Sequence, residues 1–171
     1  GYELAYRWRS AREVGGDFFD FIRLAPELLG LVIADVSDKG IPAALYMMFA
    51  RTVIRTVALS GRDPAEALER ANKLILSDST SDMFITANYG VLDIATHRLT
   101  YSSAGHNLAL HAPAGRAQLN ALTAGGLALG TADTAANMRF CREVRVRGFL
   151  AYVLAFFAAV LVTTWIGGPR L

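Results

Sequence analysis

The stretch that decides the fold is LLGLVIADVSDKGIPAAL, residues 28–45. Residues 28–36 form an apolar run interrupted only by Asp35 near its end, which is typical of a buried strand that delivers a polar side chain to the edge of a sheet. A turn follows over residues 37–42. Pro42 suits the first turn of a helix, because proline lacks the N–H donor that would be unpaired there. We therefore expect a buried strand, a loop and then a helix over residues 43–59.

Outward from this stretch, alternating and apolar segments predict further strands. They cover residues 2–8, 18–24, 83–93, 98–104, 108–112, 117–122 and 138–146. Pro26 and Glu27 suit a hairpin turn between two of them. Asp63, Pro64 and Glu66 form a capping-box pattern that predicts a second helix ending near residue 76. Strands, then two helices, then strands predict an α+β fold with a layered core.

The composition bounds the class of protein. A chain of 171 residues suits one domain, and the small net charge of +2 argues against a nucleic-acid binder, a class that usually shows a clustered basic face. A single cysteine, Cys141, excludes an internal disulfide and a cysteine-cluster metal site. The chain starts without a methionine and in the middle of an alternating pattern. We therefore expect a fragment whose full protein carries an upstream sensor domain.

The end of the chain has a different character. Residues 149–166, FLAYVLAFFAAVLVTTWI, are long and apolar enough to be a transmembrane candidate. Arg142, Arg145 and Arg147 precede them, which predicts a cytoplasmic domain with membrane association through residues 149–166. We divide the chain into a domain over residues 1–147 and an apolar tail over residues 148–171. Three interpretations of the tail stay open: a truncated or frame-shifted end, a membrane helix, or a buried part of the domain.

Two carboxylates lie where strands begin or end. Asp17 follows Gly15 and Gly16, which allow the backbone to bend sharply or to approach a ligand, and Asp35 ends the apolar run. Two such carboxylates could share a hard cation such as Mg²⁺ or Mn²⁺. The simpler interpretations are a solvated Asp17 at a β-bulge and an Asp35 that caps the following turn.

The sequence Tyr-Ser-Ser-Ala-Gly-His-Asn at residues 101–107 suggests a serine nucleophile beside His106. The Gly-x-Ser-x-Gly elbow of such hydrolases is missing, so a polar turn between strands is the default interpretation. We expect His97 and His111 to lie at the surface and Cys141 to be a small buried hydrophobe.

Five motifs together resemble the SpoIIE/RsbU branch of the PPM (type 2C-like) serine/threonine phosphatases. In chain order they are VGGDFFDF, ADVSDKGIPAALYM, MFITANYGVLD, YSSAGHN and GLALG, all between residues 14 and 130. The resemblance implies a β-sandwich flanked by helices on both faces, in α-β-β-α layers. It also implies a site at one end of the sandwich that holds two Mn²⁺ or Mg²⁺ ions.

The same resemblance implies the site residues. Asp17 and Asp35 would be the catalytic, metal-binding carboxylates, and the backbone carbonyl of Val36 a further ligand, with Gly15 and Gly16 shaping the approach. The implied reaction is one-step hydrolysis of phosphoserine or phosphothreonine by metal-activated water. The implied substrate is a phosphoserine-bearing regulatory protein of the anti-anti-sigma type, in bacterial signal transduction.

The chain departs from the family in two places. Asp38 stands where the family usually has a small residue, often glycine. The family's later Thr-Asp-Gly strand and Asp-Asp pair, which supply the other metal ligands, have no counterpart, and Glu143 is the only acid after residue 133. We therefore expect a fold that lacks the family's C-terminal strands and binds one ion or none. The alternative function is a catalytically inactive, phosphatase-like binding module for the same class of partner.

Overall fold

The computed structural model describes Tyr2 and residues 4–6, 15–61, 63–78, 82–113, 118–131, 141–146, 148–151 and 163–164. These residues form ten strands and two helices. The strands are β1 (Leu4–Ala5), β2 (Phe18–Ala25), β3 (Leu28–Val36), β4 (Ile85–Asp93), β5 (Arg98–Ala104), β6 (Ala109–Pro113), β7 (Asn120–Leu122), β8 (Arg142–Arg145), β9 (Gly148–Ala151) and β10 (Thr163–Thr164). The helices are α1 (Ile41–Ser60) and α2 (Pro64–Asp78).

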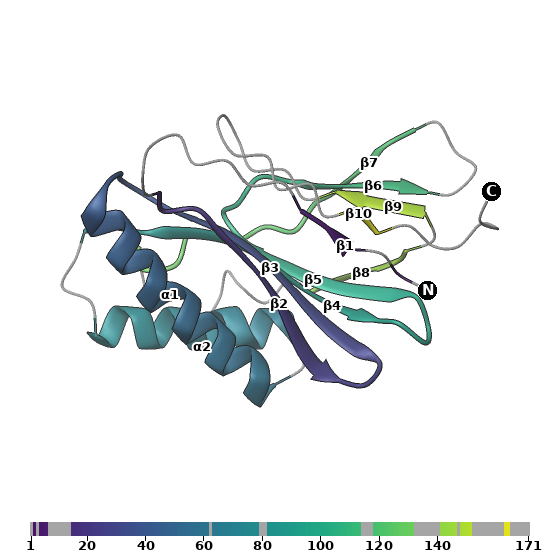
Figure 1. Ribbon diagram of the computed structural model, residues 1–171, viewed down its shortest axis with the longest axis horizontal. Coiled ribbons are helices and arrows are strands. Elements are labelled where there is room, and N and C mark those ends of the chain that lie inside the picture. Colours follow the sequence, from purple (N-terminus) through teal and green to yellow (C-terminus); the bar gives the residue numbers. More distant parts are fainter. Residues whose placement is uncertain are drawn as a thin grey trace.

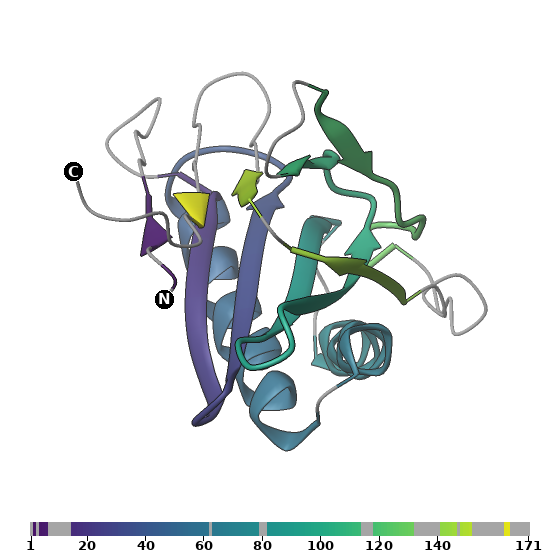
Figure 2. The same cartoon turned by 90° about the vertical axis from the view of Figure 1, so that its right-hand side faces the viewer.

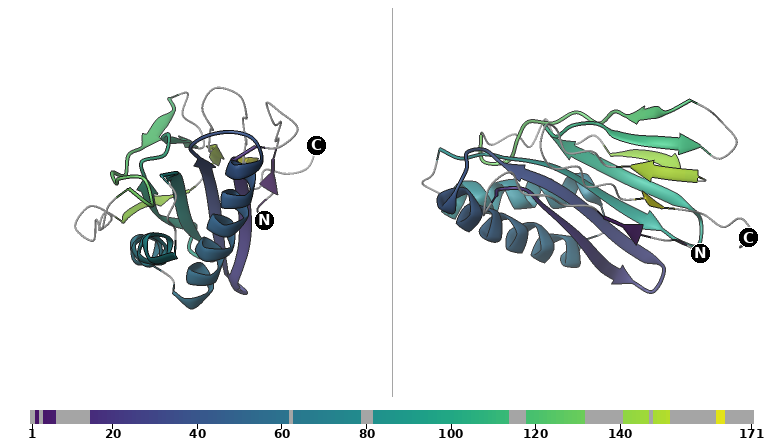
Figure 3. Two further views of the ribbon diagram at one scale, coloured as in Figure 1. Left: turned by 90° about the vertical axis from the view of Figure 1, so that its left-hand side faces the viewer. Right: turned by 45° about the horizontal axis from the view of Figure 1, so that its top comes forward.

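An antiparallel sheet with the strand order β2-β3-β4-β5-β8 is the centre of the fold. A second sheet, β7-β6-β9, lies on one side of it, and both helices cover the other side (Figure 1; Figure 2). A short pair, β1 with β10, joins segments from the two ends of the chain. The predicted α+β class and the sandwich are confirmed. The two described helices lie on the same face, so the described residues supply only one of the two expected helical layers (Figure 3).

The alternation of side chains along the central strands builds two cores. On β3, Val32 and Ala34 pack in the core beneath the helices, whereas Leu31 and Ile33 pack in the core shared with the second sheet. Because successive residues of a strand point to opposite faces, both faces of β3 are buried, which explains its nearly unbroken apolar sequence.

Helix α1 supplies much of the first core. Its buried face consists of Ala43, Tyr46, Ala50, Ile54, Val57 and Ala58, at helical spacing. By length and composition α1 could also cross a membrane, and within the described ranges no other helix could. It packs against β2 and β3 as a core helix of the domain.

The predicted turns and caps are present. Pro26 and Glu27 form the turn between β2 and β3. Asp63 caps α2, because its Oδ1 accepts a hydrogen bond of 2.9 Å from the Glu66 amide. The Glu66 carboxylate pairs with Arg70, so only half of the predicted capping box forms.

The start of the apolar tail forms part of the second sheet. Residues 148–151 make β9, which pairs with β6 through Leu110 opposite Ala151 and Pro113 opposite Gly148. The predicted transmembrane segment, residues 149–166, therefore begins with extended backbone. Residues 152–162 and 165–171 lie outside the described residues, so the membrane interpretation stays a prediction.

Candidate functional site

Asp17 and Asp35 lie side by side at one end of the sandwich. Phe18 pairs with Ala34 in the β2–β3 ladder, and the next position outward on each strand carries an aspartate. The two carboxyl groups hydrogen-bond each other. Burial, this hydrogen bond and the negative charge of Asp35 together raise the pKa of Asp17 to about 7. A carboxyl group whose pKa is raised by burial and by a neighbouring carboxylate is typical of functional sites.

Gly16 allows the backbone before β2 to lie close to Val36, beside the carboxyl pair. A Cβ on Gly16 would stand 2.9 Å from both the Cβ and the carbonyl oxygen of Val36. The Val36 amide donates a hydrogen bond of 3.3 Å to the Gly16 carbonyl oxygen. Only glycine fits so close an approach, and the Val36 carbonyl faces the side of β3 from which Asp17 enters.

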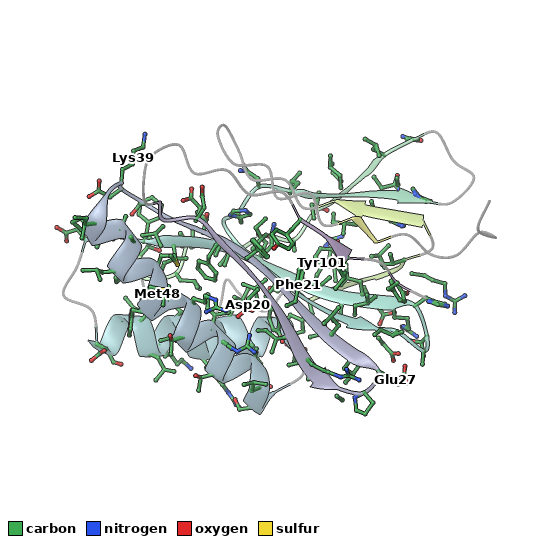
Figure 4. The ribbon with its side chains drawn as sticks, viewed as in Figure 1. Asp20, Phe21, Glu27, Lys39, Met48 and Tyr101 are labelled. Atoms are coloured by element: carbon green, nitrogen blue, oxygen red, sulfur yellow. The ribbon has the colours of Figure 1, made fainter. Side chains whose placement is uncertain are left out.

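The loop after Asp35 explains the unusual Asp38. Its φ of 84° lies in the left-handed region that favours glycine. The exposed carboxylate of Asp38 accepts a hydrogen bond of 2.7 Å from the Lys39 amide, so it is engaged within the loop. Lys39 itself extends away from the body of the domain, at the end opposite the Glu27 hairpin turn (Figure 4).

Thr86 and His106 lie next to Asp35. Thr86 is the register partner of Asp35 on β4, and its Oγ1 is 2.8 Å from Nδ1 of His106. His106 is buried, and the burial lowers its pKa to about 4, so its ring is neutral at pH 7. This contact removes the Ser-His hydrolase interpretation, because within the described part of the chain neither Ser102 nor Ser103 hydrogen-bonds to the ring.

Two other predictions about single residues are corrected. His111 was expected at the surface, but it is 3% exposed and faces the interior from β6. Cys141 is half-buried and polar in its contacts, since its Sγ accepts a hydrogen bond from the Ala65 amide and approaches the Asp63 carboxylate. Burial raises the pKa of Cys141 to about 11, so it is a protonated thiol. His97 is half-buried and bonds to the Tyr2 hydroxyl.

Sequence reasoning missed the pairing of Asp20 with helix α1. Asp20 is buried, and its Oδ2 lies 2.8 Å from Arg55 and 3.4 Å from Arg51, both on α1 (Figure 4). A signal was available, because Asp20 lies between Phe18 and Ile22 on the alternating face that is otherwise apolar. An acid at such a position needs a partner.

The acidic groups near the site are few. Within the described ranges, no three His, Cys, Asp or Glu side chains stand close enough to hold a metal ion together. The geometry thus offers the carboxyl pair of Asp17 and Asp35 and the nearby Val36 carbonyl. These are the residues that the sequence singles out, and their role as metal ligands stays a prediction.

The sequence resembles two bacterial phosphoserine phosphatases. It is 34% identical over 96 residues to Phosphoserine phosphatase RsbU of Bacillus subtilis, a match that covers 56% of this chain and 28% of RsbU. It is 27% identical over 107 residues to Phosphoserine phosphatase RsbP of the same organism, covering 60% of this chain and 27% of RsbP. The aligned part thus spans little more than a quarter of these relatives.

Solved structures show the same fold. The RsbU and RsbW domains of a Mycobacterium tuberculosis protein match with a TM-score of 0.73 and 26% identity, over 86% of this chain and 41% of that chain. The PP2C phosphatase domain of SpoIIE from Bacillus subtilis matches with a TM-score of 0.69 and 16% identity, over 86% of this chain and 42% of that chain. Residues 25–146 match the family described as Stage II sporulation protein E (SpoIIE). Because this match covers most of the chain, the chain belongs to the SpoIIE family.

Proposed function

We propose that this chain is a metal-dependent phosphatase domain that hydrolyses phosphoserine or phosphothreonine on a regulatory protein. The observation that carries the proposal is the pair of carboxyl groups at Asp17 and Asp35, which lie side by side at the end of the sandwich. The names of RsbU and RsbP, both phosphoserine phosphatases, support the reaction. A phosphoserine-bearing regulator of the anti-anti-sigma type is the class of substrate that we propose.

The residues present fit one divalent cation. Asp17, Asp35 and the Val36 carbonyl are hard oxygen donors, which Mg²⁺ and Mn²⁺ prefer. A cation beside the two carboxylates would offset the burial and the mutual repulsion that raise the pKa of Asp17. A second ion would need further ligands, since the described residues offer no third acidic side chain here.

The charge of the two carboxylates decides whether a phosphoryl group can bind at this end of the sandwich. Asp17 and Asp35 alone would repel a phosphate dianion, so substrate binding requires that their charge be neutralised. A divalent ion held by Asp17, Asp35 and the Val36 carbonyl would supply that charge, polarise phosphoryl oxygens and lower the pKa of water. The glycine at position 16 keeps the backbone beside the pair narrow and free of side chain.

The test is turnover of a phosphoserine peptide by the full chain in millimolar Mn²⁺. We expect slow, Mn²⁺-dependent release of phosphate that Asp35→Asn abolishes. Asp38→Asn is the matched control, because this acid lies three residues after Asp35, in the loop that follows β3, and its carboxylate is bonded to the Lys39 amide. Absence of turnover, or turnover that persists in Asp35→Asn, would contradict the proposal.

A second candidate is a binding module without catalysis. The absence of a third acidic ligand among the described residues favours it. Binding and turnover, measured together, separate the two functions. A catalytic domain should bind a phosphoserine peptide in Mn²⁺ and release phosphate from it, whereas a module should hold the same peptide without cleaving it.

A further inference from the structure

A chain of hydrogen bonds leads from a buried histidine to the backbone of the proposed metal ligand. His106 Nδ1 lies 2.8 Å from Thr86 Oγ1, and this oxygen lies 3.4 Å from the carbonyl oxygen of Asp35. The three residues come from separate segments: β3, β4 and the loop that follows β5.

The loop that carries His106 is tied down on both sides of the ring. Gly105 forms a parallel bridge with Ala87, and the Asn88 side-chain amide donates a hydrogen bond of 2.6 Å to the Asn107 carbonyl oxygen. His106 is 8% exposed. A buried side chain between two such anchors has little freedom, so its ring offers Thr86 a fixed partner.

The direction of the hydrogen bonds follows from counting protons. The Thr86 hydroxyl has one proton, and if it donates to the Asp35 carbonyl it must accept from Nδ1–H of His106. The ring then carries its proton on Nδ1 and a lone pair on Nε2, which is buried and has no partner among the described residues. Burial favours the neutral ring that this arrangement requires.

The Asp35 carbonyl belongs to the peptide bond between Asp35 and Val36. The amide of the same peptide bond donates to the Gly16 carbonyl oxygen, so the peptide is held from β4 on one side and from the segment just before β2 on the other. This peptide connects the two groups of β3 that we propose as ligands, the Asp35 carboxylate and the Val36 carbonyl.

We infer that Thr86 and His106 are positioning residues that fix the Asp35–Val36 peptide in the orientation that cation binding needs. The inference rests on the proposed metal site. Partners behind the ligands typically change metal affinity by about 10-fold to 100-fold when they are removed. Thr86 and His106 would act in this way through the backbone rather than through a ligand side chain.

The first measurement is Mn²⁺ affinity by calorimetry on the full chain and its variants. Thr86→Val keeps the shape of the side chain and removes the hydroxyl, and we expect it to weaken Mn²⁺ binding about 10-fold. Thr86→Ser keeps the hydroxyl and should bind within about 3-fold of the wild type. Equal affinities for the valine and serine variants would overturn the inference.

The second measurement needs no metal. Hydrogen exchange of the Val36 amide, followed by NMR without added ions, should quicken about 10-fold in Thr86→Val and stay unchanged in Thr86→Ser, because only the valine variant loosens the peptide. Exchange at Leu92, far along β4, controls for general destabilisation. Faster exchange at Val36 in a chain that binds no Mn²⁺ would support the positioning role and reject the proposed metal site. Unchanged exchange at Val36 in Thr86→Val would reject the positioning role.

Discussion

At the scale of single residues, the imidazole of His106 couples stability to pH. Burial lowers its folded pKa to about 4, below the 6.5 of an exposed histidine. Its neutral form stabilises the fold fully above pH 6.5, and this contribution is lost as the pH falls towards 4. Between pH 7.5 and pH 5 the free energy of unfolding should fall about 2 kcal/mol more in the wild type than in His106→Asn.

Urea denaturation at the two pH values measures this difference. The comparison with His106→Asn cancels the opposite contribution of Asp17, whose raised pKa makes stability fall as the pH rises towards 7. Parallel pH dependence in the two proteins would show that His106 is accessible to protons in the folded state.

The backbone conformation of Asp38 is energetically unfavourable. Its φ of 84° is costly for a residue with a Cβ, and the hydrogen bond from the Lys39 amide offsets part of that cost. Asp38→Gly should raise the free energy of unfolding by up to about 1 kcal/mol, since glycine accepts this conformation but is freer in the unfolded chain. Asp38→Ala keeps the strain and loses the hydrogen bond, so its melting temperature should be lower than those of the wild type and of Asp38→Gly. Equal melting temperatures for the glycine and alanine variants would contradict this account.

Single residues differ in how far the sequence could reveal them. Asp17 and Asp35 stand out in sequence, because Asp17 follows two glycines just before a strand and Asp35 lies near the end of an apolar run, and the hairpin makes them neighbours. The contact of Thr86 with His106 joins residues 20 positions apart through a bridge that no local pattern encodes. His111 was assigned to the wrong face because a histidine in a short strand reads as polar, whereas its alternation with the buried Ala109 turns it inward.

At the scale of elements, Asp20 links β2 to α1 through ion pairs. Its carboxylate is buried and pairs with two arginines that are partly exposed. Asp20→Asn should lower the free energy of unfolding by roughly 2 kcal/mol, because both arginines lose a partner in a partly desolvated place. Glu27→Gln, an exposed acid at the turn of the same hairpin, should change it by less than about 0.5 kcal/mol. Urea denaturation of both variants checks this, and equal losses would show that the pair contributes nothing specific.

The two arginines of this pair should contribute unequally. Arg55 lies closer to Asp20 than Arg51 does, at 2.8 Å against 3.4 Å. A double-mutant cycle with Asp20→Asn should therefore give a coupling energy larger for Arg55→Gln than for Arg51→Gln. Chemical denaturation of the single and double variants provides the four terms of each cycle. A larger coupling for Arg51 would contradict the geometry.

The elements themselves were largely predictable. Period-two alternation, a buried apolar run and the Asp63 cap placed most strands and both helices, because these signals are local. Side-by-side order in the sheets was not predictable from the same signals. β8 pairs with β5 and β9 with β6 across more than 30 residues, and such pairings depend on the whole fold.

At the scale of the whole molecule, the apolar tail contributes to the second sheet through β9. A chain that ends at Arg147 should be less stable and more prone to aggregate than one that ends at Ala151, because β6 then presents an unpaired edge. Urea denaturation and light scattering of the two truncated chains measure this. Equal behaviour would mean that β9 adds nothing to the fold and that the tail acts elsewhere, as a membrane segment would.

The hairpin of β2 and β3 also has a kinetic consequence. The two strands are joined by a turn of two residues, so their pairing can spread from Pro26 outward in a local and fast step. Asp17 and Asp35 come together only when the last pair of residues forms. At neutral pH the approach of two carboxylates opposes that last pairing. The two carboxylates of the site therefore come together last, after the rest of the hairpin has formed rapidly. A divalent ion in the refolding buffer should favour this last step and leave the earlier pairing of the two strands unchanged.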